Sequence, residues 1–184
     1  MAKGSLLASV VLGLCLILFA VGTVASENPP QWEVPDAFML FSQFSDVVAV
    51  KDVNRNPMFK CLRTIRTEYD TETPSATYDW SLNAGEDKPR KHASVQYTSG
   101  DAPASFFTTV DSDPSTREEA RFLYADFKTC GVTVIESFGY QCTLWVAYEN
   151  RYSYPECRDG MNADLCGESV SLSDKGLCND TETD

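Results

Sequence analysis

The residue types that carry out most enzyme chemistry are scarce in this chain of 184 residues. It contains one histidine, His92, which leaves little room for a histidine-rich metal site or a histidine-dependent proton relay. There is no Gly-x-Ser-x-Gly nucleophile motif and no Cys-x-x-Cys metal-binding pair. The sequence therefore predicts neither an enzyme nor a metal or cofactor site, and it favours a protein that acts by binding.

Large aromatic side chains are the residues best suited to binding chemistry here. Aromatic rings bury large apolar areas, and their faces attract cations. One set could either line a ligand pocket or fill an ordinary protein core: Phe59, Trp80, Tyr97, Phe106, Phe107, Tyr124 and Trp145. A pocket of this composition is apolar enough for a sterol, a fatty acid or a leukotriene.

The N-terminus and the cysteines predict a secreted protein that is stabilised by disulfides. An apolar run, Leu6 to Ala20, follows the basic Lys3 and precedes small residues, which is the pattern of a secretory signal peptide. We expect this signal at residues 1–26, with a signal anchor as the alternative. Cys15 lies within it, so six of the seven cysteines remain, and they predict three disulfides in any of 15 pairings. These six are Cys61, Cys130, Cys142, Cys157, Cys166 and Cys178.

Residues 27–184 have the composition of one globular domain. The whole chain is 43% hydrophobic and 23% charged, which are ordinary values for folded proteins. Its net charge of −12 argues against nucleic acid or an anionic membrane surface as a partner, because both attract Lys and Arg. We expect an extended arm at 27–35 and an acidic tail at 179–184, where Asn179 begins the single glycosylation sequon.

Short segments in which apolar and polar residues alternate must position the aromatic side chains. Eight of them follow one another at intervals of about ten residues, which favours an all-β, closed up-and-down barrel that can hold one small ligand. Asp36 can cap a short helix from Ala37 to about Phe44, and a second helix is expected from Tyr154 to Cys166. The expected strands are Val47–Val50, Phe59–Tyr69, Ser75–Leu82, Lys91–Thr98, Ser105–Val110, Glu119–Phe127, Cys130–Phe138 and Tyr140–Glu149.

Three groups of residues resemble motifs of the tick salivary lipocalins typified by the histamine-binding proteins. The first, Asp36-Ala37-Phe38, is similar to the Asp-Ala-Trp opening of that family. The second, Tyr124-Ala125-Asp126, precedes Cys130 as the family's Tyr-x-Asp precedes its central cysteine. The third has the order and spacing of the family's amine-binding signature: Cys130-Gly131-Val132, then Thr143-Leu144-Trp145, then Cys157.

The resemblance spans about Asp36 to Cys178, and it implies both a fold and an activity. The fold would be an eight-stranded antiparallel lipocalin barrel with a short N-terminal helix and a C-terminal helix. The activity would be the binding and sequestration of a small host inflammatory mediator, with histamine or another biogenic amine as the family ligand. The implied disulfides are Cys61–Cys178, Cys130–Cys157 and Cys142–Cys166.

The positions that carry acidic residues in the family's amine sites carry none here. An ammonium that leaves water needs a paired carboxylate. The family acids after the first cysteine, before Leu-Trp and before the proline of the first turn are replaced by Gly131, Thr143 and Asn56. On a looser alignment two more fall on Phe44 and His92. We therefore expect no histamine site copied residue for residue, although Thr143 remains a candidate ligand contact.

Two other carboxylates are candidate partners for an amine. Asp126 shares a strand face with Phe122 and Tyr124, and Glu136 shares one with Val134, so both reach the cavity if these faces point inward. The alternative is that each is an ordinary solvated carboxylate, or that Asp126 belongs to a turn.

The sequence thus predicts a secreted, monomeric binding protein for a small host molecule, either an amine or an apolar lipid mediator. The basic segment Lys88–His92 could receive a carboxylate head group at the barrel mouth, or it could be a solvated loop. A lipocalin that binds a protein of the immune or complement system through its loops is the remaining alternative.

Overall fold

A computed structural model describes residues 35–85, 88–136, 140–155, 157, 165–173 and 178. All of them belong to one compact unit that spans Trp32–Asp184. The expected signal peptide, the N-terminal arm, the acidic tail with Asn179 and most of the expected C-terminal helix lie outside these residues. Within the described part of the chain, no helix has both the length and the apolar character needed to cross a membrane.

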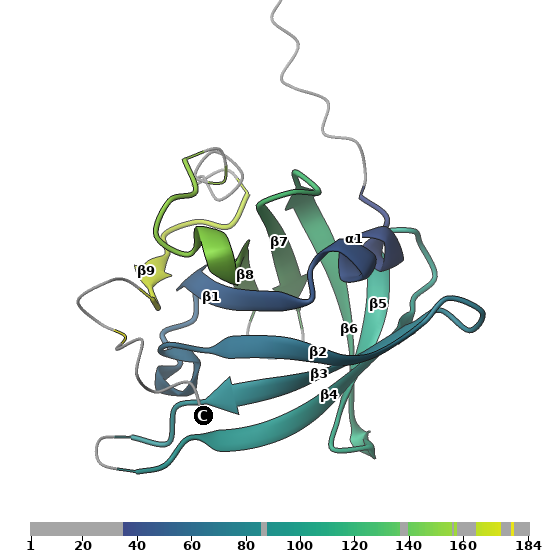
Figure 1. The fold of residues 1–184 in the computed structure, drawn as a ribbon, viewed down its shortest axis with the longest axis horizontal. Helices are drawn as coiled ribbons and strands as arrows, with labels where there is room; N and C mark the ends of the chain where they lie inside the picture. Colours follow the sequence, from purple (N-terminus) through teal and green to yellow (C-terminus); the bar gives the residue numbers. More distant parts are fainter. Residues whose placement is uncertain are drawn as a thin grey trace, which may run out of the picture. The chain divides into compact units, whose positions relative to one another are not determined.

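The described residues form an antiparallel barrel of eight strands with one short α-helix, as the sequence predicts (Figure 1). Most predicted strand ends lie within two residues of the observed bounds, but two strand starts were wrong, and the predicted end of the seventh strand, Phe138, lies outside the described residues. Phe59 belongs to a 3-10 turn because Asn56 caps it and Pro57 opens it, and the sixth strand begins at Asp113. The elements are α1 Ala37–Gln43, β1 Asp46–Asp52, η1 Pro57–Phe59, β2 Arg63–Asp70, β3 Ser75–Leu82, β4 Lys91–Ser99, β5 Ser105–Val110, β6 Asp113–Ala125, β7 Cys130–Ile135, β8 Gln141–Ala147, η2 Tyr148–Asn150 and β9 Val170–Ser171.

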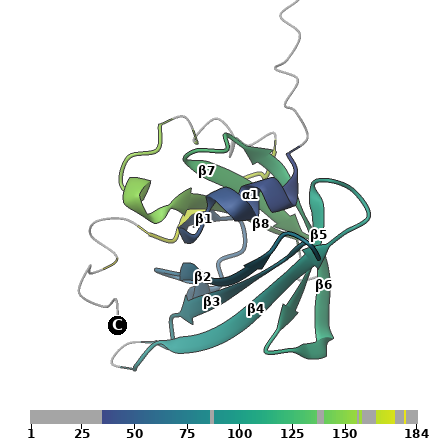
Figure 2. The ribbon, with the colours of Figure 1, turned by 45° about the vertical axis from the view of Figure 1, so that its right-hand side comes forward.

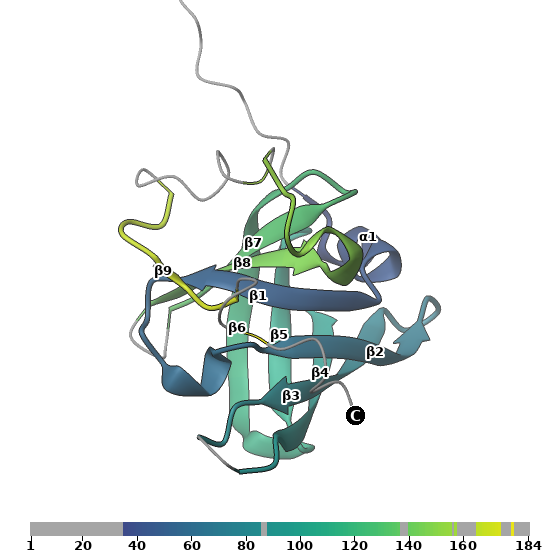
Figure 3. The ribbon, with the colours of Figure 1, turned by 60° about the vertical axis from the view of Figure 1, so that its left-hand side comes forward.

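The barrel closes through β1, which pairs with both β8 and β2. The β1–β2 contact is short and joins Asp46–Val48 to Arg63–Ile65. Beyond it, the freed half of β1 pairs with β9 from the C-terminal segment, which Figure 3 shows beside β1 on the outside of the barrel. Both edges of β1 are therefore paired with other strands, and the eight strands of the barrel enclose an interior.

Helix α1 closes one end of the barrel (Figure 2). Asp36 starts the helix by accepting the backbone N–H groups of Phe38 and Met39, each at 2.9 Å. Three strand side chains then donate to carbonyl groups of the helix and of Phe44, its C-cap: Tyr69 to Phe38, Arg66 to Phe41, and Tyr78 to Phe44. These bonds fix the helix across the barrel end, so the connections at the opposite end form the mouth.

The outer face of β1, β7 and β8 is apolar because the segment that follows β8 packs against it. Val48, Val132, Leu144 and Val146 are buried there, beside the described cysteines of that segment. The disulfides of the structure are Cys61–Cys178, Cys130–Cys157 and Cys142–Cys166, the same pairs that the family resemblance implies. They attach the C-terminal segment to the barrel wall, and none of the six paired cysteines is among the described residues that line the interior cavity.

Candidate functional site

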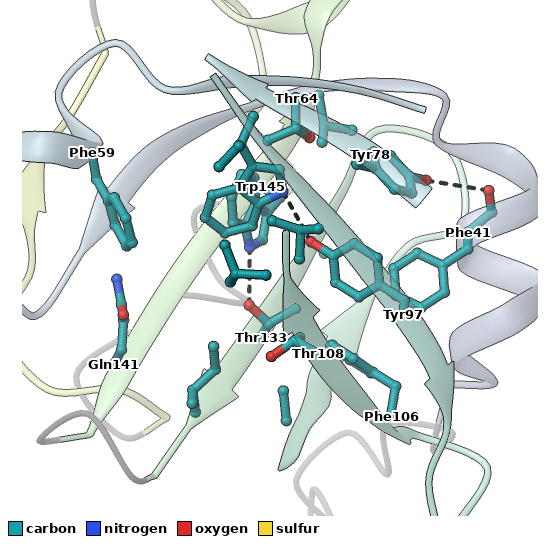
Figure 4. Close-up of a pocket in the computed structure, with 18 of the residues that line it drawn as sticks. Phe41, Phe59, Thr64, Tyr78, Tyr97, Phe106, Thr108, Thr133, Gln141 and Trp145 are labelled. Atoms are coloured by element: carbon teal, nitrogen blue, oxygen red, sulfur yellow. Dashed lines mark hydrogen bonds between the residues drawn. The ribbon is translucent and has the colours of Figure 1, made fainter. Parts of the chain in front are cut away.

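The barrel interior contains a cavity of about 520 Å³. This volume lies within the range of about 300–1,000 Å³ that is usual for small-molecule sites. Figure 4 shows Phe41 at the helix end of the cavity, with Phe59 and Gln141 at the other end. The wall is mainly apolar, and its aromatic rings are Phe41, Phe44, Phe59, Tyr78, Trp80, Tyr97, Phe106, Phe122 and Trp145.

Phe41 of α1 is the centre of the aromatic floor. Its ring centroid lies 4.8 Å from that of Tyr97, 5.2 Å from Phe106 and 5.7 Å from Phe122. Tyr78 lies 6.0 Å away. The edge-on and tilted orientations of these rings are those that aromatic quadrupoles favour. The floor is therefore a close-packed cluster that holds a helix and four strands together.

Two tryptophans form the middle of the cavity wall, and both of their N–H groups are bonded. The rings of Trp80 and Trp145 lie 5.4 Å apart. Trp80 Nε1 donates to the Tyr97 hydroxyl at 3.1 Å, and Trp145 Nε1 donates to Thr133 Oγ1 at 2.9 Å. These bonds fix two large flat surfaces against which a ligand can pack.

Among the described residues, no charged side chain lines the cavity. Besides the two indole N–H groups, the polar side-chain groups of the described wall are hydroxyls and amides: Asn54, Asn56, Thr64, Tyr78, Tyr97, Thr108, Thr116, Thr133 and Gln141. Several of these are already committed within the protein, because Thr108 donates to the Glu118 carbonyl and Tyr78 to the Phe44 carbonyl. The interior thus suits a neutral, mostly apolar molecule.

A buried carboxylate, Asp52, lies behind the cavity wall at its mouth. Its side chain is fully buried. It accepts the Asn54 backbone N–H at 2.5 Å, the Gln141 amide at 3.2 Å, and a short bond from the Thr143 hydroxyl. Burial raises the pKa of Asp52, while these three hydrogen bonds oppose that rise. Of this group, Asn54 and Gln141 reach the cavity surface, whereas Asp52 and Thr143 do not line it.

Gly131 stands where the family's amine signature has an acid after the first cysteine, and it lies against the ring of Phe122. A Cβ atom built on Gly131 would lie 3.2 Å from Phe122 Cε1, which is a tighter approach than almost all real Cβ contacts. A side chain at residue 131 would therefore require the Phe122 ring to shift by a few tenths of an ångström. Thr143 is committed to Asp52, and Asn56 caps η1 by accepting the Met58 N–H at 3.0 Å.

Phe44 and His92, the two positions of the looser alignment, also place no charge toward the cavity. Phe44 lies on the cavity wall as an apolar ring. His92 bonds Asp79 at 2.9 Å, and both side chains are about half exposed on the outer face of β3 and β4. Arg90 of the same basic segment donates to Ser81 and to the Cys61 carbonyl, so it holds the β3–β4 connection in place.

Five of the ten predicted ligand contacts line the cavity: Phe59, Trp80, Tyr97, Phe106 and Trp145. The other five lie elsewhere. Phe107 points outward beneath the Arg117 guanidinium, 3.3 Å from the ring centroid. Tyr124 packs in the outer cluster with Cys130, and Thr143 binds Asp52. The last two, Asp126 and Glu136, are carboxylates of the β6–β7 turn and the end of β7.

A shift in the register of β6 explains the positions of Tyr124 and Asp126. The pairing of β6 with β7 slips between Phe122 and Tyr124, so Phe122 faces the cavity and Tyr124 faces outward. Asp126 then caps the turn that follows, accepting the backbone N–H groups of Lys128, Thr129 and Cys130 at 2.6–2.9 Å. Its neighbours Cys130 and Cys157 are joined in a disulfide, so they offer no thiolate to a metal.

Glu136 lies on the outer surface beyond β7. Its carboxylate pairs with Arg121 at 2.9 Å, and more than half of each side chain is exposed. Gly131, Thr133 and Ile135 are the β7 residues that line the cavity, so the face that carries Val132 and Val134 points away from it.

Sequence reasoning missed several cavity residues. Phe41 was expected only within the short helix that follows Asp36, and Tyr78 only within the alternating strand Ser75–Leu82. Nothing marked Asp52 or Gln141. The one signal for Tyr78 is its strand face, which it shares with Trp80 and Leu82, and all three side chains point inward.

The fold is shared with proteins of known structure. No protein-family model matches the chain, and no curated protein matches it significantly. Among solved structures, AM182 in complex with serotonin superposes with a TM-score of 0.60 at 12% identity, over 77% of this chain and 92% of that one. Japanin from Rhipicephalus appendiculatus, bound to cholesterol, superposes with a TM-score of 0.52 at 9% identity, over 72% and 94%.

These neighbours are tick salivary lipocalins. The chain has their fold. Both neighbours were solved with a small molecule bound, serotonin in AM182 and cholesterol in Japanin. At these identities the likeness establishes the lipocalin architecture, while the ligand has to be argued from the cavity.

Proposed function

We propose that this lipocalin is secreted after cleavage of residues 1–26 and that it sequesters a small, apolar host mediator, without catalysis and as a monomer. A leukotriene, a fatty acid or a sterol fits the proposal. The observation that carries it is the cavity wall, which is aromatic and has no charged side chain among the described residues. The six paired cysteines support an extracellular location.

The energetics of transfer favour an apolar ligand over an amine. Each Å² of apolar surface that a ligand buries contributes about 25 cal/mol, so a largely enclosed hydrocarbon body gains several kcal/mol. An ammonium in the same cavity would lose its hydration without meeting a carboxylate, which costs several kcal/mol. The rings of Trp80 and Trp145 could recover only part of that loss through cation–π attraction.

An amine such as histamine or serotonin is the second candidate, and Asp52 is the observation that favours it. This carboxylate lies one side chain behind Gln141, at the mouth of the cavity. If Gln141 turned aside, an ammonium could approach Asp52 from the cavity. The three donors already bonded to Asp52 oppose this arrangement, because each would have to be displaced or shared.

The deciding experiment uses the secreted, disulfide-bonded protein. Native mass spectrometry would reveal a retained lipid, and titration calorimetry with arachidonic acid, cholesterol, histamine and serotonin would rank the ligand classes. We expect binding of an apolar ligand and at most weak binding of the amines. Quenching of tryptophan emission should accompany binding, because Trp80 and Trp145 line the cavity.

Sub-micromolar affinity for an amine would overturn the apolar proposal, and its loss in the Asp52→Asn variant would then identify the counter-charge. If no small molecule binds, the alternative becomes a partner protein of the immune or complement system, to be sought by capture from host serum.

A further inference from the structure

The hydrogen bonds of the two cavity tryptophans determine which groups remain for a ligand. An indole N–H can only donate a hydrogen bond. Trp80 therefore uses a lone pair of the Tyr97 oxygen, and Trp145 uses a lone pair of Thr133 Oγ1. Each hydroxyl keeps its own hydrogen, which must point away from the indole. Figure 4 shows both bonds, with the Tyr97 and Thr133 oxygens at the centre of the cavity wall.

Tyr97 is the clearer case, because its hydroxyl hydrogen has no acceptor among the described residues. The side chain is 8% exposed, and its oxygen bonds only the Trp80 indole. Burial raises the pKa of Tyr97, so the phenol keeps its proton at physiological pH and remains a donor. A buried donor without an acceptor is unfavourable, and an acceptor atom in the cavity would relieve this.

Tyr78 provides the contrast on the neighbouring strand. It also lines the cavity, but its hydroxyl donates to the Phe44 carbonyl and thereby anchors α1. Its hydrogen is used inside the protein. The two tyrosines therefore offer a ligand similar ring surfaces, and of the two only Tyr97 has a hydroxyl hydrogen to offer.

The polarity of the cavity restricts the ligand further. An ammonium has donors only, so it cannot satisfy Tyr97. A carboxylate could accept the bond, but no charged side chain of the described cavity wall would balance its negative charge. A neutral oxygen, in a hydroxyl or a carbonyl group, accepts the bond without burying a charge.

We propose that Tyr97 is a specificity-determining residue whose O–H donates to a neutral hydroxyl or carbonyl oxygen on an otherwise apolar ligand. The proposal rests on the proposed function, since it names the ligand class of the same cavity. It narrows that class to alcohols, ketones and their relatives, and it excludes hydrocarbons without a polar atom as the preferred ligands.

The test compares two probes that differ in one carbonyl group, 2-nonanone and nonane, by titration of tryptophan emission. In Tyr97→Phe we expect the dissociation constant of 2-nonanone to rise about two- to tenfold, which is the net value of one hydrogen bond. The constant for nonane should change less than about twofold, because the ring is retained. In the comparison variant Tyr78→Phe, whose hydroxyl bonds the protein and not the ligand, any change in the dissociation constant should be equal for the two probes.

A second measurement reads the hydrogen bond directly. The carbonyl stretching band of bound 2-nonanone should lie at lower frequency in the wild type and in Tyr78→Phe than in Tyr97→Phe. Equal effects of Tyr97→Phe on the two probes, or a carbonyl band that does not respond to it, would refute the role of Tyr97 while leaving apolar binding intact. If neither these probes nor the lipids of the calorimetric titration bind the wild-type protein, the proposed function itself fails, and the two failures are thus distinguishable.

Discussion

Replacing Asp52 tests whether this buried carboxylate at the barrel mouth is destabilised by its burial or stabilised by the three hydrogen bonds that it accepts. In Asp52→Ala three donors lose their acceptor: the partly buried Asn54 N–H, and the buried Gln141 amide and Thr143 hydroxyl. Each unsatisfied donor costs about 1–3 kcal/mol. The hydroxyl and the amide can turn toward other partners, and the cost of burying the charge disappears. We therefore expect a net loss of about 2–4 kcal/mol in the free energy of unfolding.

Asp52→Asn removes the charge of the side chain while keeping its shape. The asparagine keeps one acceptor oxygen and the same volume, so its cost at low pH should be small. The pKa of Asp52 in the folded protein is raised above its ordinary value of 3.8. The unfolded chain therefore releases the proton first, and the stability contributed by the protonated folded form is lost as pH rises through the folded pKa. The wild type should lose stability relative to Asp52→Asn as pH increases above about 4.

Urea unfolding of both proteins between pH 3 and pH 8, with the disulfides intact, measures this difference. The gap in unfolding free energy should widen in favour of Asp52→Asn by at most about 1.4 kcal/mol per pH unit until the folded pKa is passed. Asp46→Asn is the control on the same strand: its partly exposed pair with Arg63 should be worth less than about 1 kcal/mol. A gap that stays constant or narrows with rising pH would show that the hydrogen bonds outweigh burial, and that Asp52 is a stabilised anion.

Three further predictions concern stability. Phe41→Ala should lose about 3 kcal/mol in urea unfolding, the low end for a buried ring, because one side of Phe41 already faces the cavity. Gly131→Asp should lower the thermal midpoint and weaken apolar probe binding, since its Cβ atom would lie 3.2 Å from the Phe122 ring and force that ring to shift; unchanged values would mean that Phe122 shifts without cost. Removing the Cys61–Cys178 disulfide, which spans 117 residues, should cost about 4–5 kcal/mol in calorimetry if chain entropy dominates.

The sequence predicted the cavity best where strands alternate without interruption. In β3 and β4 the apolar faces containing Trp80 and Tyr97 both point inward. Their pairing runs from Ser75 with Thr98 to Leu82 with Lys91 without a shift, so the period of two residues is preserved. Here the local pattern alone determines which side chains meet the ligand.

Prediction failed at irregularities in strand pairing, which no periodic pattern reveals. The slip in β6 separates Phe122 from Tyr124, although the sequence places them on one face. In β1 a similar shift lies between Ala49 and Lys51. Regular alternation from Ala49 would turn Lys51 inward, but the shift aligns Asp52 with Thr143 on the inner side instead. The register shift in β1 thus determines that the barrel buries the charge of Asp52 and not that of Lys51.

The register shift in β1 also affects whether an amine or a lipid is the better ligand. The chain has 27 acidic residues, and among the described ones only Asp52 is buried. Its bonds to Gln141 and Thr143 keep it behind the wall, while Asp126 and Glu136 serve a turn and a surface pair. The negative charge therefore acts on the solvent side, where it affects solubility and encounter, and the selection of the ligand falls to neutral hydroxyls and aromatic rings.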